Sequence, residues 1–402
     1  MKILVINCGS SSIKFKLFSM PENMLVATGL IEKIGSPDAI VKYSKDGISI
    51  NNTQEVPDHN HGLEIIAKLL TDPTCGAVKN LNEIKGVGHR VVHGGEEFTG
   101  SMLIDEKVKN KIEEFIPLAP LHNPPNFQGI VAAEKYFPES VQVACFDTAF
   151  HTTLPPVAYL YALPYDFYEK YRIRRYGFHG TSHRYVARRF AQILGRHKYG
   201  VSLITCHLGN GCSITAVKNG KSIDTSMGFT PLEGLVMGTR SGDIDPGVIL
   251  YFIENLKMKP SDVNKILNKE SGLTGISGVS NDFRSIVESA SKGNKMAQLA
   301  IEIFSYRVKK YIGAYLAVLG NVDGIVFTAG IGENQPVVRE KSLDGLENYG
   351  IVIDKEKNQD VKSKEAEISA PDSKVKVFVI PTNEELAIAI DTYEFTKKQL
   401  KF

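Results

Sequence analysis

The sequence predicts an α/β protein of two domains in which one structural pattern occurs twice. A chain of 402 residues exceeds what one hydrophobic core usually supports, so two domains are the expected arrangement. Each half opens with an apolar strand, a glycine-containing turn and a second strand, at residues 2–18 and 201–217. Each half then contains a later apolar strand that ends in a loop, at residues 141–146 and 324–327. Two matched elements in the same order indicate an internal duplication.

The individual elements follow from hydrophobic periodicity and turn residues. Asn219-Gly220 is a strong signal for a two-residue hairpin loop. The strands expected around the turns are residues 2–7, 13–18, 25–34, 201–207, 212–217 and 221–225. Apolar residues at helical spacing predict helices at residues 182–194, 246–256, 260–268, 294–319 and 384–400. The segment 355–370, rich in lysine and glutamate, is expected to be solvated surface and not a binding site.

The composition argues against several classes of partner. The 47 basic and 45 acidic residues give a net charge of +2, which offers no general reason to expect a nucleic acid or a membrane as partner. No apolar stretch is long enough to span a bilayer. The five cysteines are odd in number and include no CxxC pair, so we expect reduced thiols and no zinc cage. These features predict a soluble, cytoplasmic protein.

Three glycine-containing turns are candidate phosphate-binding loops. The first, residues 7–14 (NCGSSSIK), offers small hydroxyl residues and the charge of Lys14, although it is not a Walker loop. The second is residues 207–211 (HLGNG), in the equivalent place of the second half. The third, residues 329–334 (AGIGEN), follows a strand, and Gln335 replaces the last glycine of a dinucleotide fingerprint. Each turn alone is more often a plain turn, but the pair of opening turns favours two phosphate loops that face each other across a cleft.

Arginines and histidines supply the candidate cationic groups. Arg90 and Arg240 lie among small residues, so each guanidinium has room to reach a carboxylate or phosphate, with an ion-pair role as the alternative. The grouped histidines are His89, His93, His122, His179, His183 and His207. His179 and His183 have the spacing of a metal pair, but no glutamate completes an HExxH motif, so zinc is not expected. An imidazole that stabilises phosphoryl oxygens is the favoured interpretation.

Nine motifs together resemble the acetate kinase family along the whole chain. They are NCGSSSIK, GHRVVHGG, APLHNPPN, FDTAFH, YGFHGTSH, HLGNGCS, MGTRSGDIDP, FTAGIGEN and PTNEE, and their order and spacing also match. The family belongs to the actin, Hsp70 and sugar-kinase superfamily. The resemblance therefore implies two duplicated α/β domains of the actin-like ATPase (ribonuclease H-like) type around a nucleotide cleft. The expected domains are residues 1–149 plus 385–402 and residues 150–384, and a homodimer is implied by the resemblance alone.

The resemblance also implies roles for the residues that match its motifs. Asn7 and Glu384 would bind the metal, expected to be Mg²⁺ with Mn²⁺ as the alternative. Lys14, with Ser10 and Ser12 of the turn that precedes it, would hold the phosphates of ATP or ADP. The other expected nucleotide contacts are His207, Leu208, Gly209, Asn210, Gly211, Asp282, Phe283, Arg284, Gly330, Ile331, Gly332, Glu333 and Asn334. The expected catalytic residues are Arg90, His122, Asp147, His179 and Arg240. Arg90 would also bind the carboxylate of acetate, whose methyl group would lie among Val92, Leu121, Phe178 and Pro231.

The reaction implied is reversible transfer of the γ-phosphoryl group of ATP to acetate, giving acetyl phosphate and ADP. Carboxyl groups titrate near pH 4, so the acceptor is already ionised and needs no general base. For that reason Asp147, a catalytic acid by the resemblance, is better suited to orient cationic partners or to hold magnesium through water. The alternatives are a propionate or butyrate kinase with a larger pocket, a sugar or polyol kinase with Asp147 as base, and an actin-like ATPase that transfers nothing.

Overall fold

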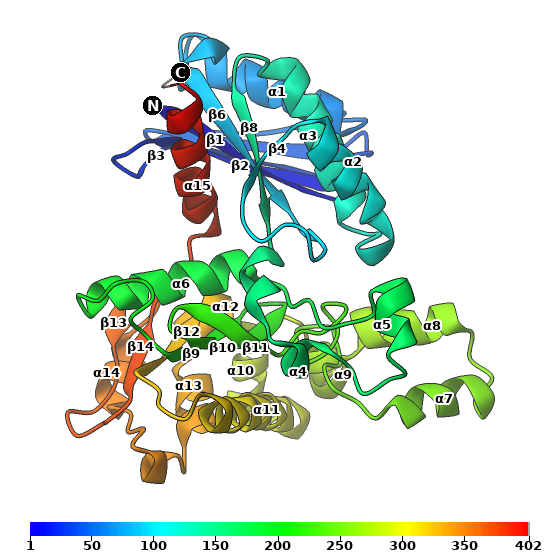
Figure 1. Ribbon diagram of the computed structural model, residues 1–402, viewed down its shortest axis with the longest axis vertical. Helices are drawn as coiled ribbons and strands as arrows, with labels where there is room; N and C mark the ends of the chain where they lie inside the picture. The colour runs from blue at the N-terminus through cyan, green and yellow to red at the C-terminus, as the bar shows by residue number, and fades with distance from the viewer. Residues whose placement is uncertain (401–402) are drawn as a thin grey trace. The chain divides into compact units, whose positions relative to one another are not determined.

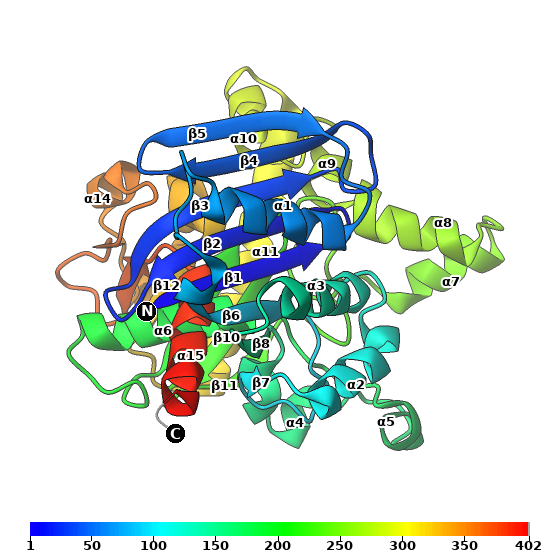
Figure 2. The same cartoon turned by 90° about the horizontal axis from the view of Figure 1, so that it is seen from above.

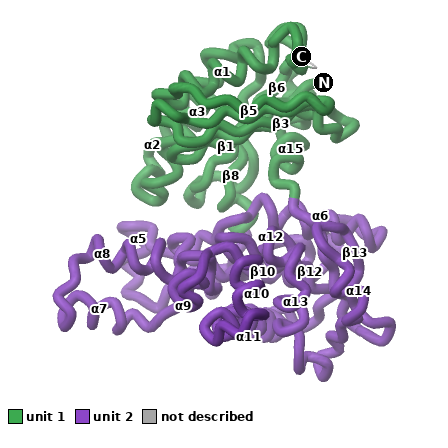
Figure 3. The backbone as a smooth tube through the Cα atoms, turned by 180° about the vertical axis from the view of Figure 1, so that it is seen from behind, with its two compact units in different colours: residues 1–152, 383–402 green, residues 153–382 purple. Residues whose placement is uncertain are grey.

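The computed structural model describes residues 1–400, which divide into two compact units. Unit 1 comprises Met1–Thr152 together with the returning segment that starts at Asn383, and unit 2 comprises Thr153–Thr382 (Figure 3). Each unit contains one β-sheet with helices against it, so the predicted α/β class with two domains is confirmed. Within the described residues, no helix has both the length and the apolar character needed to cross a membrane.

The sheet of unit 1 has eight strands in the order β5-β4-β3-β2-β1-β6-β8-β7 (Figure 2). The strands are β1 Lys2–Gly9, β2 Ser12–Ser19, β3 Met24–Glu32, β4 Ala39–Lys45, β5 Ile48–Gln54, β6 Ile84–Val91, β7 Met102–Leu103 and β8 Val141–Phe146. Strands β1 to β5 form an antiparallel meander, whereas β6 and β8 run parallel to β1. The carboxyl ends of β1, β6 and β8 therefore meet at one edge of the sheet.

Helices cover both faces of this sheet. They are α1 His59–Thr71, α2 Glu106–Glu114, α3 Asn123–Tyr136 and the returning α15 Glu384–Gln399. Strand β1 alternates between two cores, with Leu4 and Ile6 in the core that α1 and α3 share and Ile3 in the core against α15. Side chains buried on both faces explain why β1 reads as one continuous apolar run.

The sheet of unit 2 has six strands in the order β11-β10-β9-β12-β14-β13. They are β9 Leu203–Leu208, β10 Cys212–Lys218, β11 Lys221–Thr225, β12 Gly324–Thr328, β13 Ala366–Glu367 and β14 Lys376–Val379. Strands β9 to β11 are antiparallel, β12 and β14 run parallel to β9, and β13 is antiparallel to β14.

The two sheets share one topology. The order β3-β2-β1-β6-β8-β7 in unit 1 equals β11-β10-β9-β12-β14-β13 in unit 2, with the same strand directions, so the predicted duplication is confirmed. The predicted pairing of residues 141–146 with 324–327 is wrong by one strand, because β8 corresponds to β14 and β12 corresponds to β6. Both are buried parallel strands, and an apolar run does not encode its place in the strand order.

The helices of unit 2 are α4 Pro156–Tyr159, α5 Asp166–Tyr171, α6 Gly180–Ile193, α7 Pro246–Glu254, α8 Pro260–Lys265, α9 Gly272–Ser277, α10 Phe283–Ser291, α11 Lys295–Leu319, α12 Ala329–Asn334, α13 Pro336–Leu343 and α14 Lys355–Asp360. Helices α6, α11 and α12 pack against the sheet of unit 2, whereas α7 and α8 extend away from it (Figure 1). The long α11 begins where Asn294 accepts hydrogen bonds from two backbone amides of its first turn. The helix expected at residues 260–268 is shorter, since a π-helical turn, Ile266–Glu270, follows α8.

Candidate functional site

In unit 1, the ends of two parallel strands bring Arg90 and Asp147 together. Arg90 is the penultimate residue of β6, and Asp147 directly follows β8. The Nε atom of Arg90 donates to Oδ1 and Oδ2 of Asp147 at 3.2 and 3.1 Å, and Nη2 donates to Oδ2 at 2.5 Å. Although burial opposes the charged form, the carboxylate beside it raises the pKa of Arg90. The bonded edge of Arg90 is thus fixed, and Nη1 stays available for an anionic ligand.

Glu384 lies next to this pair because α15 begins there. Its carboxylate is 3.8 Å from Nε of Arg90. Burial raises the pKa of Glu384 to about 7, which the charge of Arg90 opposes and the charge of Asp147 reinforces. Two carboxylates therefore share one guanidinium, and Glu384 holds the less compensated charge.

The first glycine turn joins β1 to β2 at the same edge of the sheet. Asn7 and Lys14 are cross-strand partners, and Gly9 pairs with Ser12 at the turn that includes Ser10. Lys14 lines a groove of about 540 Å³ together with Lys16 and Lys42. One edge of unit 1 thus brings together Asn7, Lys14, Arg90, Asp147 and Glu384.

Two asparagines of the NPPN motif fix the backbone around this edge. Asn126 donates to the carbonyl of Cys8 at 2.7 Å and accepts from the amide of Val92 at 3.0 Å, so it joins β1 to the residue after β6. Asn123 bonds both the amide and the carbonyl of His93, at 3.1 Å each. Sequence reasoning missed these roles, because a buried asparagine that bonds to backbone leaves no signal of spacing or charge.

The remaining residues singled out in unit 1 differ in exposure. Val92 is buried, Leu121 is 70% exposed, and His122 immediately precedes α3. His89 faces the other way: it is buried, and its Nε2 lies 2.8 Å from Oε1 of Gln142. Burial lowers the pKa of His89 to about 4, so this histidine is a neutral part of the core.

In unit 2, three histidines form one group that is held by hydrogen bonds to serines and by ring stacking. His179 has a left-handed backbone at the start of α6, its Nδ1 lies 2.9 Å from Oγ of Ser213, and its ring stacks on that of His207 at 4.2 Å. His183 holds the same Ser213 at 2.7 Å through Nε2. His207 in turn bonds Ser182 through Nδ1 at 2.8 Å. The bonded Nδ1 atoms set the orientation of both stacked rings.

Arg240 lies close to this group. A Cβ atom built on Gly211 would be 3.4 Å from both Nη1 of Arg240 and Nε2 of His179, so the glycine leaves room where these side chains converge. Among residues 1–400, no carboxylate pairs with Arg240, whose Nη1 donates weakly to the carbonyl of Pro231 at 3.4 Å. Burial without a counter-ion lowers the pKa of Arg240. A partly buried guanidinium without a counter-ion favours an anionic ligand.

A groove of about 1010 Å³ is lined by four segments that are far apart in the sequence. Its walls include these residues expected to contact nucleotide: Gly209, Asn210, Asp282, Phe283, Arg284, Gly330, Ile331 and Asn334. Asn281, which was not predicted, also lines it and donates to Oδ1 of Asn210 at 3.1 Å. The size and the mixed polar and apolar walls suit a ligand of nucleotide size.

The third glycine segment differs in form from the expected loop. Helix α12 begins at Ala329, so Gly330, Ile331 and Gly332 lie inside the helix and not before it. Glu333 accepts from the amide of Thr382 at 3.1 Å, and burial raises the pKa of its carboxyl. This contact holds α12 against the segment that follows β14.

Arg339 anchors the same wall of the groove from beneath. It is fully buried and donates to the carbonyls of Gly332 and Glu333, at 2.9 and 3.0 Å, and to those of Asn358 and Val361, at 2.7 and 2.9 Å. It thereby joins the end of α12 to the segment around α14. The prediction that residues 355–370 are only solvated surface is wrong, because Asn358 is buried and Gln359 and Lys362 line the groove. Because residues 355–370 are rich in charged side chains, the buried part of this segment was not predicted from the sequence.

The residues expected around a methyl group come from both units. Val92 and Leu121 belong to unit 1, and Phe178 and Pro231 belong to unit 2. Phe178 is buried directly before His179, and Pro231 is bonded to Arg240 as described.

Comparisons with known proteins agree along the whole chain. Residues 2–390 match the model of the acetokinase family. The acetate kinase of Desulfitobacterium hafniense strain DSM 10664 / DCB-2 is 55% identical over 399 residues, which are 99% of this chain and 100% of that protein. The crystal structure of Porphyromonas gingivalis acetate kinase is 49% identical, with a TM-score of 0.95 over 98% of this chain and 99% of that one. A propionate kinase from Francisella tularensis is 46% identical, with a TM-score of 0.91 over the same shares.

Proposed function

We propose, from the premise that this chain belongs to the acetokinase family, that it transfers the γ-phosphoryl group of ATP to acetate, reversibly, giving acetyl phosphate and ADP. The observation that carries the proposal is 55% identity to an acetate kinase over 99% of the chain. The grooves and cationic groups described above support it, since they offer sites for a nucleotide and for a small anion.

We assign nucleotide binding to the 1010 Å³ groove of unit 2. Asp282, Phe283 and Arg284 start α10 on one wall, and Gly330 to Asn334 form α12 on another. The turn of residues 207–211 would meet the phosphates from unit 2, and Lys14 with Ser10 and Ser12 would meet them from unit 1.

Acetate binding is assigned to Arg90. Asp147 holds Arg90 by a bidentate contact, which leaves Nη1 for the acceptor carboxylate. A carboxylate needs no base to attack phosphorus, so Asp147 acts as the group that positions Arg90. The methyl group of acetate would contact Val92, Leu121, Phe178 and Pro231.

Charge neutralisation then accounts for catalysis. Arg240 brings an uncompensated guanidinium, and His179 a ring fixed by Ser213, to positions suited to the equatorial oxygens of the transferring phosphoryl group. His122 is assigned a further contact with these oxygens.

The residues at the edge of unit 1 fit a magnesium ion. Glu384 carries a partly buried carboxylate that Arg90 compensates only at 3.8 Å, and Asn7 adds an amide oxygen. Mg²⁺ uses one or two carboxylates and completes its shell with waters and substrate phosphates, so two protein ligands suffice. Once bound, Mg²⁺ or Mn²⁺ would neutralise phosphate charge.

Propionate is the second candidate acceptor. The similarity to a propionate kinase, 46% identical, supports it, because the two activities differ in the volume offered to the alkyl group.

The deciding experiment is acyl phosphate formation from ATP and Mg²⁺ with acetate, propionate and butyrate in parallel, trapped as hydroxamates. We expect the largest kcat/KM with acetate. A larger value with propionate would reassign the acceptor, and ATP hydrolysis without any acyl phosphate would refute the transferase.

Three further assignments complete the proposal. The proposed domains keep the bounds expected from the sequence, residues 1–149 plus 385–402 and residues 150–384, to within three residues of the two compact units, and Glu384 is counted with unit 1 as in those units. All five cysteines are free and buried, which supports a reducing, cytoplasmic location. The protein is proposed to be a homodimer, because α7 (PGVILYFIE) buries none of its residues although it is strongly apolar.

A further inference from the structure

The loop that carries Pro231 and Arg240 is anchored by three side chains to which no role has yet been given. The loop spans residues 226–245, between β11 and α7, and contains no helix or strand. Arg175, Glu233 and Tyr161 hold its first half, and together they are named the Arg175 brace. A loop of this length needs such contacts if it is to present two side chains in fixed positions.

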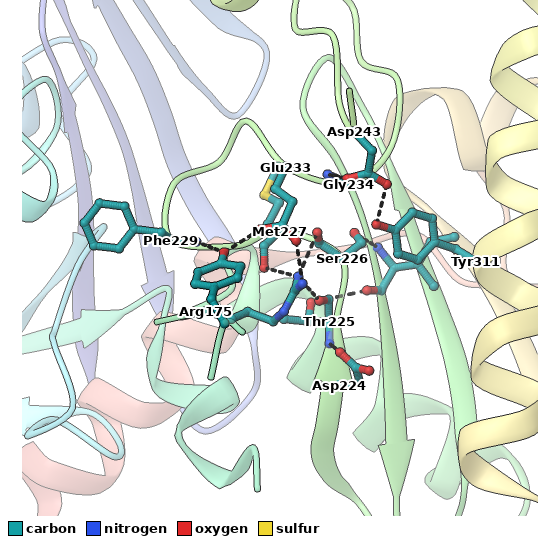
Figure 4. Close-up of polar contacts among 12 residues, drawn as sticks. Arg175, Asp224, Thr225, Ser226, Met227, Phe229, Glu233, Gly234, Asp243 and Tyr311 are labelled. Atoms are coloured by element: carbon teal, nitrogen blue, oxygen red, sulfur yellow. Dashed lines mark hydrogen bonds and ion pairs between the residues drawn. The ribbon is translucent and has the colours of Figure 1, made fainter. Parts of the chain in front are cut away.

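The brace bonds both the backbone and a side chain of the loop (Figure 4). The Nη1 atom of Arg175 donates to three successive carbonyls, those of Thr225, Ser226 and Met227, at 2.8, 3.1 and 3.2 Å. The Nη2 atom of Arg175 donates to Oε1 of Glu233 at 2.5 Å. One guanidinium therefore fixes the start of the loop and, through Glu233, its middle.

Tyr161 closes the brace from the segment before α5. Its hydroxyl donates to Oε2 of Glu233 and accepts from the amide of Phe229 at 2.8 Å. A Cβ atom on Gly228 would overlap both Oε2 of Glu233 and the hydroxyl of Tyr161, so the loop backbone passes directly over this pair. Residues 228 to 233 are thus held at both ends of a short arc, and Pro231 lies on that arc.

A second contact secures the far half of the loop. Asp243 accepts from the amide of Gly234 at 2.7 Å and from the hydroxyl of Tyr311, on α11, at 2.8 Å (Figure 4). Arg240 lies between the two anchored points, and its Nη1 donates to the carbonyl of Pro231 at 3.4 Å. The arc held by the brace is therefore itself a contact of Arg240.

We propose that Arg175, Glu233 and Tyr161 are positioning residues, which fix Pro231 against the acceptor's alkyl group and thereby set the discrimination between acetate and larger acids. The inference rests on the proposed function, because Pro231 matters in this way only if a small carboxylate is the acceptor. None of the three side chains lines the 1010 Å³ groove, so their loss should change acetate binding more than nucleotide binding.

The test compares Tyr161→Phe with the parent protein in the hydroxamate assay. The substitution removes one hydroxyl that bonds a charged group and a backbone amide, and it keeps the ring. We expect KM for acetate to rise about tenfold, as loss of a hydrogen bond to a charged group implies. KM for ATP should stay within about twofold, and the ratio of kcat/KM for acetate to that for propionate should fall.

Two further variants make the result interpretable. Glu233→Gln keeps the size of the side chain and removes the charge partner of Arg175. It should change KM for acetate and the acetate preference in the same direction, and it replaces Tyr161→Phe as the test if that variant does not fold. Arg196→Met is the matched control, since it removes an Arg–Asp pair of unit 2, with Asp323 at 2.7 Å, that does not touch the loop. Thermal unfolding of each variant reports the folded state.

The outcomes separate the two proposals. A parent without acetate-dependent acyl phosphate would overturn the proposed function and the brace with it. An active parent whose folded Tyr161→Phe variant keeps its acetate KM and its acetate preference would overturn the brace alone. An equal rise of KM for ATP would also overturn it, because that pattern indicates a general loosening of unit 2.

Discussion

Arg90 and Arg240 carry the same charge in opposite surroundings. Asp147 compensates Arg90 and raises its pKa, whereas Arg240 is partly buried without a carboxylate partner and its pKa is lowered. A guanidinium that already has a counter-ion is held in place, and one without a counter-ion gains most when an anion arrives. Removal of Arg90 and removal of Arg240 should therefore change the kinetic parameters differently.

Arg240→Ala is expected to lower kcat by about 10²–10³, the usual loss when a preorganised charge at the transition state is removed. Arg90→Ala should lower kcat by a similar factor and also raise KM for acetate. Steady-state kinetics on both variants, with circular dichroism for folding, make the measurement. Arg189→Ala, which removes an exposed pair with Glu365, serves as control and should change little. Near-normal turnover in both active-site variants would refute the assigned roles.

Glu384 gives a pH dependence to the stability of the metal-free protein. Burial raises its pKa from 4.5 to about 7, so between these values the folded state holds a proton that the unfolded state has released. The contribution of Glu384 to stability is thus fully present below pH 4.5 and is lost as the pH rises through 7. Urea unfolding at pH 5 and pH 8 should show a smaller decline for Glu384→Gln than for the parent. Equal declines would contradict the raised pKa.

The pKa shift of His89 is opposite in direction to that of Glu384, and so is its effect on stability as the pH changes. Its pKa is lowered from 6.5 to about 4. As the pH falls below 6.5, His89 therefore binds a proton in the unfolded state but not in the folded state. Stability should fall over that window by up to roughly 3 kcal/mol. Urea unfolding of the parent and of His89→Gln between pH 7 and pH 5 tests this, and the variant should lose less stability on acidification. A decline as steep in the variant would assign the acid sensitivity to other groups.

At the scale of elements, the docking of α15 on β6 depends on two glycines. A Cβ atom on Gly88 would overlap Oγ1 of Thr392 and lie 2.6 Å from Cγ2 of Ile388, and one on Gly86 would overlap Oγ1 of Thr396. Both threonine hydroxyls donate to carbonyls one turn earlier, at 2.7 Å, so they stay satisfied within a tight interface. The spacing of helix and strand is therefore set by the missing side chains.

Gly88→Ala should lower the free energy of unfolding by about 1–3 kcal/mol, because the added methyl group overpacks this interface. Gly313→Ala provides a control of opposite sign. Gly313 lies within α11, nothing is within 4 Å of its added Cβ, and the change should raise stability by about 0.5–1 kcal/mol. Chemical denaturation of the two variants measures both. A neutral Gly88→Ala would mean that α15 can shift outward at little cost.

Local signals in the sequence predicted some elements well, whereas others, such as α1, α2 and α3, were not predicted. Asn219 and Gly220 have positive φ values of 50° and 70°, as the hairpin prediction requires, and α11 and α15 match their predicted ranges within one residue. What the sequence missed depends on tertiary contacts. The role of Arg339 comes from carbonyls up to 22 residues away, and Asn126 bonds the carbonyl of Cys8, 118 residues away. Such partners share no local pattern, so only the folded chain reveals them.

At the scale of the whole molecule, the exposed helix α7 carries the proposal of a dimer. Leu250 and Tyr251 are 56% and 54% exposed on a helix with no buried residue. Replacing both with glutamate should give a protein of half the parent's mass in sedimentation velocity, since charges at the centre of an apolar interface are costly. Val131→Lys, on α3 of unit 1, is the control and should not change the mass. A dimer that survives the double substitution would place the interface elsewhere.

The return of α15 to unit 1 orders the folding of the newly made chain. The ribosome synthesises all of unit 2 before it adds the helix that covers Ile3, Val5 and Val143. Unit 2 can fold once it has emerged from the ribosome. The sheet of unit 1, which is made earlier, keeps one apolar face uncovered until translation approaches its end. If translation stalled before Asn383, the nascent chain would lack α15. The sheet of unit 1, although made first, would then keep an uncovered apolar face, and a chaperone would bind there.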